Sequence, residues 1–224
     1  QWEYGVHYQL LDYSGQAVSE KTKVNTGDAG YGKVAALANS NWVVVWAGFS
    51  DNVGLYGQLV SPGGLKIGGV FDVHSSAGDG FGWPSVAALQ EGGFVAAWSG
   101  ESSLLQRFDA QGNKVGGEQL LDSQSLKPSV GAFSGGSFVA VWQKESDIFG
   151  RQFDNMGQPL TDIFSVNEST NGVQNNPSVS VIAGDNFVVS WDSPAGIRYQ
   201  LFDELGSKIG GEKAASALPG TYPI

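Results

Sequence analysis

Phe138-Val139-Ala140-Val141-Trp142 is the stretch that decides the fold, because near copies of it recur along the chain. The tryptophans that close the copies stand at positions 46, 98, 142 and 191, and Trp2 ends a fifth copy that lacks its beginning. Successive tryptophans from position 2 onward are separated by 44, 52, 44 and 49 residues. A period of this length is typical of four-stranded propeller blades.

Each repeat also contains three further apolar runs around the tryptophan motif. The run before it reads Pro84-Ser85-Val86-Ala87-Ala88-Leu89, with copies starting at Pro128 and Pro177 and a variant without proline starting at Gly32. The run after it ends in a D-x-x-G turn, such as the one from Asp109 to Gly112, and a fourth run follows. Short apolar runs separated by glycine, asparagine, serine and proline, without helical spacing, predict strands.

The second run of each repeat is apolar at consecutive positions, as in Val43-Val44-Val45, so the strand must be covered on both faces. The first run is rich in small residues, such as Ala87 and Ala88, which suit a strand near a crowded central axis. The sequence therefore predicts an all-β protein, a five-bladed β-propeller of four-stranded antiparallel blades with the first run innermost.

The predicted propeller is one domain over residues 1–224, and its first blade is split between the chain ends and incomplete. The next tryptophan belongs near position 238, about 47 residues further on, beyond Ile224. Either a longer parent chain or a neighbouring subunit supplies the missing strands, or the ring closes imperfectly. An exposed half-blade edge would pair with other chains, so we expect one of the first two alternatives. The predicted boundaries are 1–31 for the outer half of blade 1, 32–83, 84–127, 128–176 and 177–218 for blades 2 to 5, and 219–224 for the start of the closing strand.

The composition narrows the function classes. The chain has 224 residues and no cysteine, which excludes disulfides and thiolate metal sites. Its net charge of -10 opposes binding to nucleic acid or anionic lipid. No apolar run approaches membrane-spanning length, so we expect no membrane insertion.

The repeat unit resembles tandem repeats of large secreted bacterial adhesins and of proteins of the RTX type. The stretches that carry the resemblance are Ile148-Phe149-Gly150-Arg151-Gln152-Phe153-Asp154 and Gly92-Gly93-Phe94-Val95-Ala96-Ala97-Trp98. The resemblance implies a secreted or cell-surface module for display or recognition, without catalysis. The aspartate-rich nonapeptides that bind calcium in RTX proteins do not occur in this sequence, so we predict neither a metal site nor a cofactor.

Candidate ligand-binding residues lie in the links between the second and third runs and between blades, which share one rim and vary in sequence. Trp83 stands out, because it lies outside the repeat motif in a glycine-rich loop next to Asp79 and Phe81. An aromatic ring beside a carboxylate suits a sugar, although Trp83 would equally fill a gap between two blades. The other candidates on this rim are polar: Asp28, Asp51, Asn52, Glu101, Glu145, Gln174, Asn175 and Asp192.

Catalytic signals are weak. The innermost runs contain none of the paired carboxylates of propeller glycosidases, and His7 and His74 are the only histidines. Neither a G-x-S-x-G motif nor a P-loop occurs. Our leading hypothesis is a non-catalytic extracellular module that binds glycans through one rim. The alternative is a self-assembling unit of an adhesin or fibre, in which a neighbour completes the open blade; a glycosidase comes third.

Overall fold

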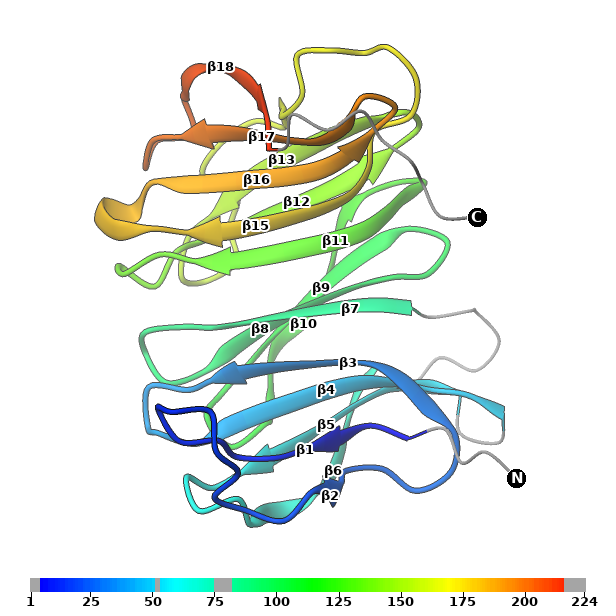
Figure 1. The fold of residues 1–224 in the computed structure, drawn as a ribbon, viewed down its shortest axis with the longest axis vertical. Helices are drawn as coiled ribbons and strands as arrows, with labels where there is room; N and C mark the ends of the chain where they lie inside the picture. Colours follow the sequence, from blue (N-terminus) through cyan, green and yellow to red (C-terminus); the bar gives the residue numbers. More distant parts are fainter. Residues whose placement is uncertain (1–4, 51–52, 75–81, 216–224) are drawn as a thin grey trace.

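The computed structural model describes residues 5–50, 53–74 and 82–215. The described strands form four antiparallel sheets of four strands and one sheet of two strands (Figure 1). The short 3₁₀ turn η2 (Ala183–Asp185) interrupts one link. In these described ranges, no helix is long and apolar enough to cross a membrane.

Each four-stranded sheet follows the chain, with neighbouring strands joined by tight turns. The N-terminal pair is β1 (His7–Tyr8) and β2 (Thr22–Lys23). The four complete sheets are β3 (Ala29–Ala36), β4 (Trp42–Gly48), β5 (Gly54–Val60) and β6 (Lys66–His74); β7 (Gly82–Ala88), β8 (Phe94–Ser99), β9 (Ser103–Phe108) and β10 (Lys114–Asp122); β11 (Ser125–Ala132), β12 (Phe138–Lys144), β13 (Asp147–Phe153) and β14 (Phe164–Ser165); β15 (Asn175–Val181), β16 (Phe187–Ser193), β17 (Gly196–Phe202) and β18 (Lys208–Ala214).

The first strand of each complete sheet lies innermost, as predicted. Strands β3, β7, β11 and β15 follow one another around a common axis, and all four begin at the same end of it (Figure 1). The predicted all-β propeller is therefore confirmed. None of the described sheets closes on itself, and β1 and β2 form a separate sheet of two strands. Strand β3 begins at Ala29, where it pairs with Gly48 of β4.

The hydrophobic core lies between neighbouring sheets, and the motif tryptophans are its largest members. Trp98 and Trp142 are fully buried, and Trp46 and Trp191 are at most 2% exposed. Trp142 packs in a cluster with residues of the preceding sheet, including Leu105. The consecutive apolar positions of the second strands are thus covered on both faces, as the sequence predicts.

The P-S-V motif links the inner strands of neighbouring blades. The Oγ atom of Ser85 accepts a hydrogen bond from the backbone N–H of Val130, and Ser129 Oγ accepts one from Val179, both at 3.1 Å. These bonds lock the spacing of the blades around the axis. Ser178 occupies the same position in β15 and is exposed to solvent.

The D-x-x-G motifs form turns in which the aspartate carboxylate accepts two backbone N–H groups, two and four residues further on. In the turn of Asp109 both distances are 2.9 Å, and Gly112 adopts a φ of 84°. At Asp12, the hydroxyl of Ser14 and the backbone N–H of Gln16 hold the pKa of the carboxyl below its ordinary value. The D-x-x-G turns that the sequence predicts are confirmed.

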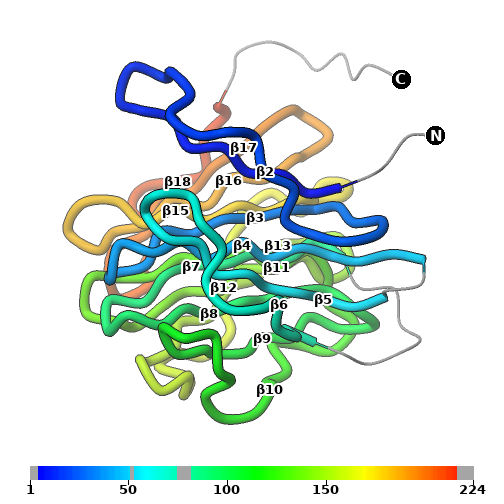
Figure 2. Tube along the Cα trace, turned by 90° about the horizontal axis from the view of Figure 1, so that it is seen from below, coloured from blue at the N-terminus to red at the C-terminus, as the bar shows by residue number. Residues whose placement is uncertain are grey.

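The N-terminal pair β1–β2 packs on the face of the β3–β6 sheet (Figure 2). Val24 is buried against Val44, Trp46 and Val60, and Val6 packs at the edge of the same cluster. The pair therefore occupies the position of the two outer strands of a blade.

Candidate functional site

Every inner strand carries a one-residue bulge at the same place. In β7, Gly82 pairs with Ser99 and Ser85 pairs with Ala97. The segment of β7 between these pairs is therefore one residue longer than the segment of β8 that it faces. The same shift occurs in β3, β11 and β15. The first bulge residue in each strand has a left-handed backbone: φ is 54° at Tyr31, 48° at Trp83, 51° at Lys127 and 51° at Asn176.

The left-handed conformation at Lys127 is held by a contact between blades. A residue before proline normally adopts an extended backbone, so the conformation of Trp83, Lys127 and Asn176 is unfavourable locally. At Lys127, the backbone N–H donates a hydrogen bond of 2.5 Å to Ser99 Oγ in the preceding blade. A bulge redirects the side chain that it carries. The four bulges thus present four different side chains at equivalent places around the axis.

These side chains surround a cavity of about 320 Å³ at the end of the axis where the inner strands begin. All four complete blades contribute to this axial mouth, each through its first bulge residue and the two residues that follow. The lining ranges are 31–33, 83–85, 127–129 and 176–178. The volume is at the lower end of the range for small-molecule sites.

Trp83 forms an open aromatic surface in the axial mouth. The side chain is 44% exposed, which does not fit a residue that fills a gap between blades. Its ring lies 5.8 Å from the ring of Tyr31, tilted by 33°, and Lys127 Nζ lies 5.5 Å from its centroid. The mouth therefore combines two aromatic rings with a cation.

Two of the predicted residues form hydrogen bonds with residues that line the mouth. Asn175 Oδ1 accepts a hydrogen bond of 2.6 Å from Lys127 Nζ, and Asp192 Oδ2 accepts one of 2.6 Å from Asn176 Nδ2. Asn175 and Asp192 thus position Lys127 and Asn176, which the sequence analysis did not select. The available signal was their position: each directly precedes the proline of an inner strand.

The remaining candidates lie away from the mouth. Gln174 is 1% exposed, and its Oε1 accepts a hydrogen bond of 3.0 Å from the indole N–H of Trp191. Its role is therefore structural, and it is not part of the axial mouth. Asp28 lines a separate cavity of about 100 Å³. Glu101 and Glu145 are exposed in turns and do not line the mouth. The candidates Asp51, Asn52, Asp79 and Phe81 lie outside the described residues.

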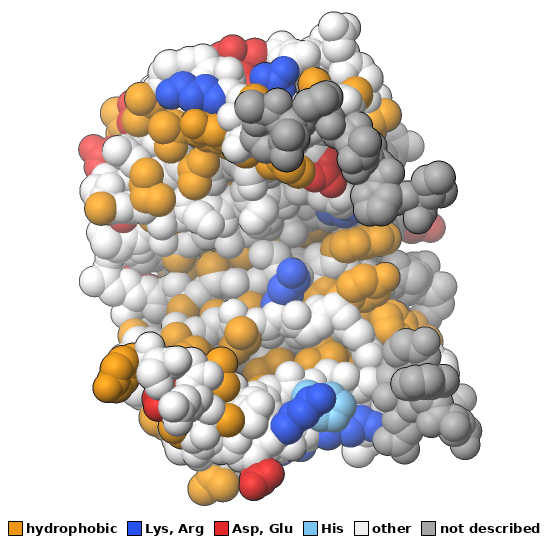
Figure 3. Space-filling model, viewed as in Figure 1, with side chains coloured by type: hydrophobic (Ala, Val, Ile, Leu, Met, Phe, Trp, Pro, Cys, Tyr) orange, Lys and Arg blue, Asp and Glu red, His pale blue; other side chains and the backbone are white. Residues whose placement is uncertain are grey.

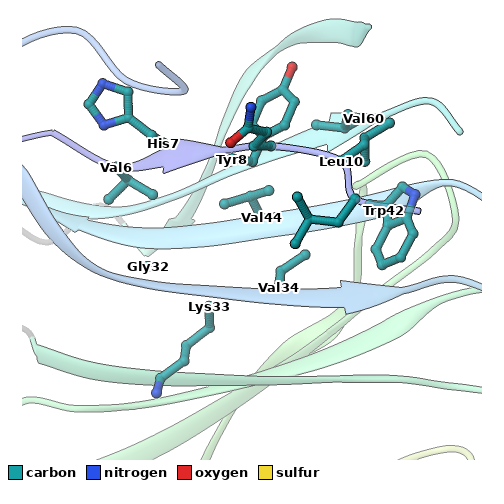
Figure 4. Close-up of a pocket in the computed structure, with 12 residues that line it drawn as sticks. Val6, His7, Tyr8, Leu10, Gly32, Lys33, Val34, Trp42, Val44 and Val60 are labelled. Carbon is teal, nitrogen blue, oxygen red and sulfur yellow. The ribbon is translucent and has the colours of Figure 1, made fainter. Parts of the chain in front are cut away.

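A second, more apolar cavity lies beside the N-terminal strand pair (Figure 4). This half-blade groove has a volume of about 510 Å³ and lies between β1 and the face of β3–β5. Figure 4 shows Val34 and Val44 on its floor, while Lys33 points to the other side of β3. Val34 remains 58% exposed. The groove corresponds to the place that inner strands fill in the complete blades.

The histidines and acidic residues do not form a metal site in the described ranges, where no group of three or more potential ligands comes together. His74 Nδ1 lies 2.9 Å from both carboxylate oxygens of Glu118, and its ring lies 5.3 Å from that of Trp98. His74 therefore connects the end of β6 to the neighbouring blade, which is formed by β7 to β10.

Comparisons with known proteins identify the fold and no family. No family model matches the chain, and no curated protein matches it. The chain is similar in structure to a protein of unknown function from Dyadobacter fermentans, with a TM-score of 0.64 and 11% identity over 83% of this chain and 68% of that one. A protein of unknown function from Bacteroides caccae has a TM-score of 0.60 and 13% identity over 98% and 72% of the two chains.

The propeller of Dos1 is also similar, with a TM-score of 0.58 and 14% identity over 91% of this chain and 53% of that one. Other similar structures are a thermostable family-43 glycoside hydrolase, an α-L-arabinofuranosidase from Fusarium graminearum and a microbial sialidase, at 13%, 9% and 11% identity. Similarity at this level shows the β-propeller fold alone, a fold that enzymes and proteins of unknown function share.

Proposed function

We propose that this chain is a non-catalytic module that recognises carbohydrate at the axial mouth. The proposal depends on the exposed ring of Trp83, which a strand bulge holds beside Tyr31 and Lys127 over a cavity of about 320 Å³. The C–H face of a sugar packs on an aromatic ring, while its hydroxyl groups bind amine, amide and hydroxyl groups. The mouth offers these polar groups through Lys127, Asn176 and the serines that follow the prolines.

The lining of the mouth supports recognition over hydrolysis. Among its described residues none is aspartate or glutamate, whereas glycoside hydrolysis ordinarily requires two carboxyl groups across the scissile bond. The resemblance of the repeats to those of secreted bacterial adhesins supports an extracellular setting.

The test compares two exposed aromatic residues. A glycan array identifies ligands, and calorimetric titration then measures their affinity for the wild type, Trp83→Ala and Tyr13→Ala. We expect Trp83→Ala to weaken binding at least tenfold, or about 1.4 kcal/mol, because it removes the stacking surface. Tyr13 is fully exposed in a D-x-x-G turn between β1 and β2, so its loss should leave the affinity unchanged.

Thermal melting of all three proteins verifies that each is folded. An array without hits, or equal affinities for wild type and Trp83→Ala, would contradict glycan recognition at this site.

A second candidate function is a self-assembling unit, and the half-blade groove favours it. The groove exposes apolar side chains at the position where strands of the same repeat pack in complete blades. Its proposed occupant is therefore a strand of a second copy of this chain, and strand β1 offers an edge for pairing.

Light scattering over a range of protein concentrations tests the assembly. We expect the mass to rise with concentration for wild type and for the control Val173→Lys, and Val34→Lys to keep the protein monomeric by placing a charge in the groove. Val34 and Val173 are 58% and 52% exposed, so both variants should fold. A wild type that stays monomeric at every concentration removes this candidate.

A further inference from the structure

We propose that the axial mouth selects sugars that carry a carboxylate, with the carboxylate near Lys127 and Lys33 and the sugar ring on Trp83. This inference rests on the carbohydrate-binding function proposed above and specifies the class of ligand. It is derived from the charges at the two ends of the propeller axis and from the partners of the lysines.

The charge of the mouth is opposite to that of the whole chain. The protein has a net charge of -10, yet the described residues that line the mouth include two lysines and no acidic residue. At the other end of the axis, a cavity of about 440 Å³ is lined by Asp185 and by no basic residue among those described. There the hydroxyl and backbone N–H of Ser134 hold the pKa of Asp185 below its ordinary value, so this end carries a negative charge.

Lys127 differs in its partners from the lysines that form ion pairs. Lys144 and Lys114 form ion pairs with Asp122 and Glu118, at 2.6 and 3.2 Å. Lys127 instead donates to the neutral carboxamide of Asn175 and lies over the ring of Trp83. Its charge is thus held in place, half-buried, without a carboxylate among its described contacts.

Lys33 adds a second cation from β3, whose blade is separated from that of Lys127 by the blade of Trp83. Its side chain points away from the half-blade groove, on the other side of β3 (Figure 4). Figure 3 views the molecule in the orientation of Figure 1 and shows basic side chains, in blue, in the hollow at the middle of this face. Two ammonium groups near one cavity favour an anion, and the partial burial of Lys127 strengthens the attraction.

The arrangement of ring and cation fits a sugar acid. The carboxylate of a pyranose acid projects from the edge of the ring, so a sugar stacked on the open part of Trp83 can present it to an ammonium group that lies over the indole. Lys127 Nζ lies over the indole in this way, 5.5 Å from its centroid. A neutral sugar would use the same stacking surface and bring no opposite charge to the two lysines.

The experiment uses one oligosaccharide in two charge states. Calorimetric titration compares trigalacturonate with its methyl ester, which keeps the rings and removes the charges. We expect the wild type to bind the acid at least tenfold more tightly, and this preference to shrink at high salt, because salt screens the attraction. Lys127→Gln and Lys33→Gln should each reduce the preference, and Lys127→Arg should retain most of it.

Lys213→Gln is the matched control, because it makes the same change of net charge on the exposed outer strand β18. It should keep the preference for the acid. If the ester binds as tightly as the acid and Trp83→Ala abolishes both, the selection of carboxylates is wrong and carbohydrate recognition stands. If a glycan array and both oligosaccharides show no binding, both proposals fail. A sulfated oligosaccharide that binds more tightly than the carboxylate would overturn the assignment of the anion.

Discussion

Trp142→Ala should lower the free energy of unfolding by about 3–5 kcal/mol, the range for removing a large aromatic side chain from a packed core. Trp142 is fully buried between two sheets, in a core cluster that includes Val95, Leu105 and Phe153. Its indole N–H also donates to Asp122 Oδ2 at 3.3 Å, so the substitution removes a hydrogen bond as well. A loss of this size is a large share of the stability of a typical domain.

Equilibrium unfolding in urea, followed by far-UV circular dichroism, measures this effect. Trp83→Ala is the matched control, since it removes the same side chain from an exposed position and should cost about 1 kcal/mol or less. If the two variants lose similar stability, the motif tryptophans do not form the core described above.

Gly93→Ala should destabilise the protein by about 2–4 kcal/mol, because the added methyl group would overlap the backbone carbonyl oxygen of Phe108. That carbonyl cannot move away easily. Phe108 pairs with Phe94 in the β8–β9 ladder, and the two rings stack at a centroid distance of 4.7 Å. A shift of the backbone would therefore disturb both the ladder and the core.

Gly117→Ala provides the control for the glycine substitution. Gly117 lies in β10, and a methyl group there would meet no atom within 4 Å. We expect its free energy of unfolding to change by less than about 1 kcal/mol, with a gain arising from the smaller entropy of the unfolded chain. Equal urea midpoints for Gly93→Ala and wild type would show that the turn between β7 and β8 has room that the structure denies it.

The repeats made the architecture predictable, because each feature occurs several times in different surroundings. The motif ending in Trp142 and the turn at Asp109 could both be compared with their copies. Features that occur in every copy could thus be told apart from patterns that occur once by chance. The D-x-x-G turns depend on local hydrogen bonds, which neighbouring residues specify. The order of the strands followed from burial on two faces and from small residues near the axis.

The axial mouth was only partly predictable. Trp83 was selected because it departs from the repeat, and it lies in the mouth. Lys127 and Asn176 were missed, since a residue before proline is expected to be extended and not to form a left-handed bulge. The contact that holds Lys127, with Ser99 of another blade, joins positions 28 residues apart and leaves no local pattern.

Other long-range roles were hidden for the same reason. Gln174 reads as a polar loop residue, yet it binds the indole of Trp191 in the interior. Gln106 and Gln200 lie in third strands, and each donates from its side-chain amide to backbone carbonyls of the neighbouring fourth strand, at 3.0 Å. These bonds bridge the irregular pairing of the two strands. A glutamine within an apolar run does not by itself indicate such a bridge.

The four bulges have a consequence for how such a protein diversifies. Their backbone is the same whether the side chain is tyrosine, tryptophan, lysine or asparagine. Chemistry at the mouth can therefore be exchanged one blade at a time without refolding the scaffold. Gene duplication followed by point substitution at positions 31, 83, 127 and 176 would generate a set of relatives that share one scaffold and differ in ligand specificity.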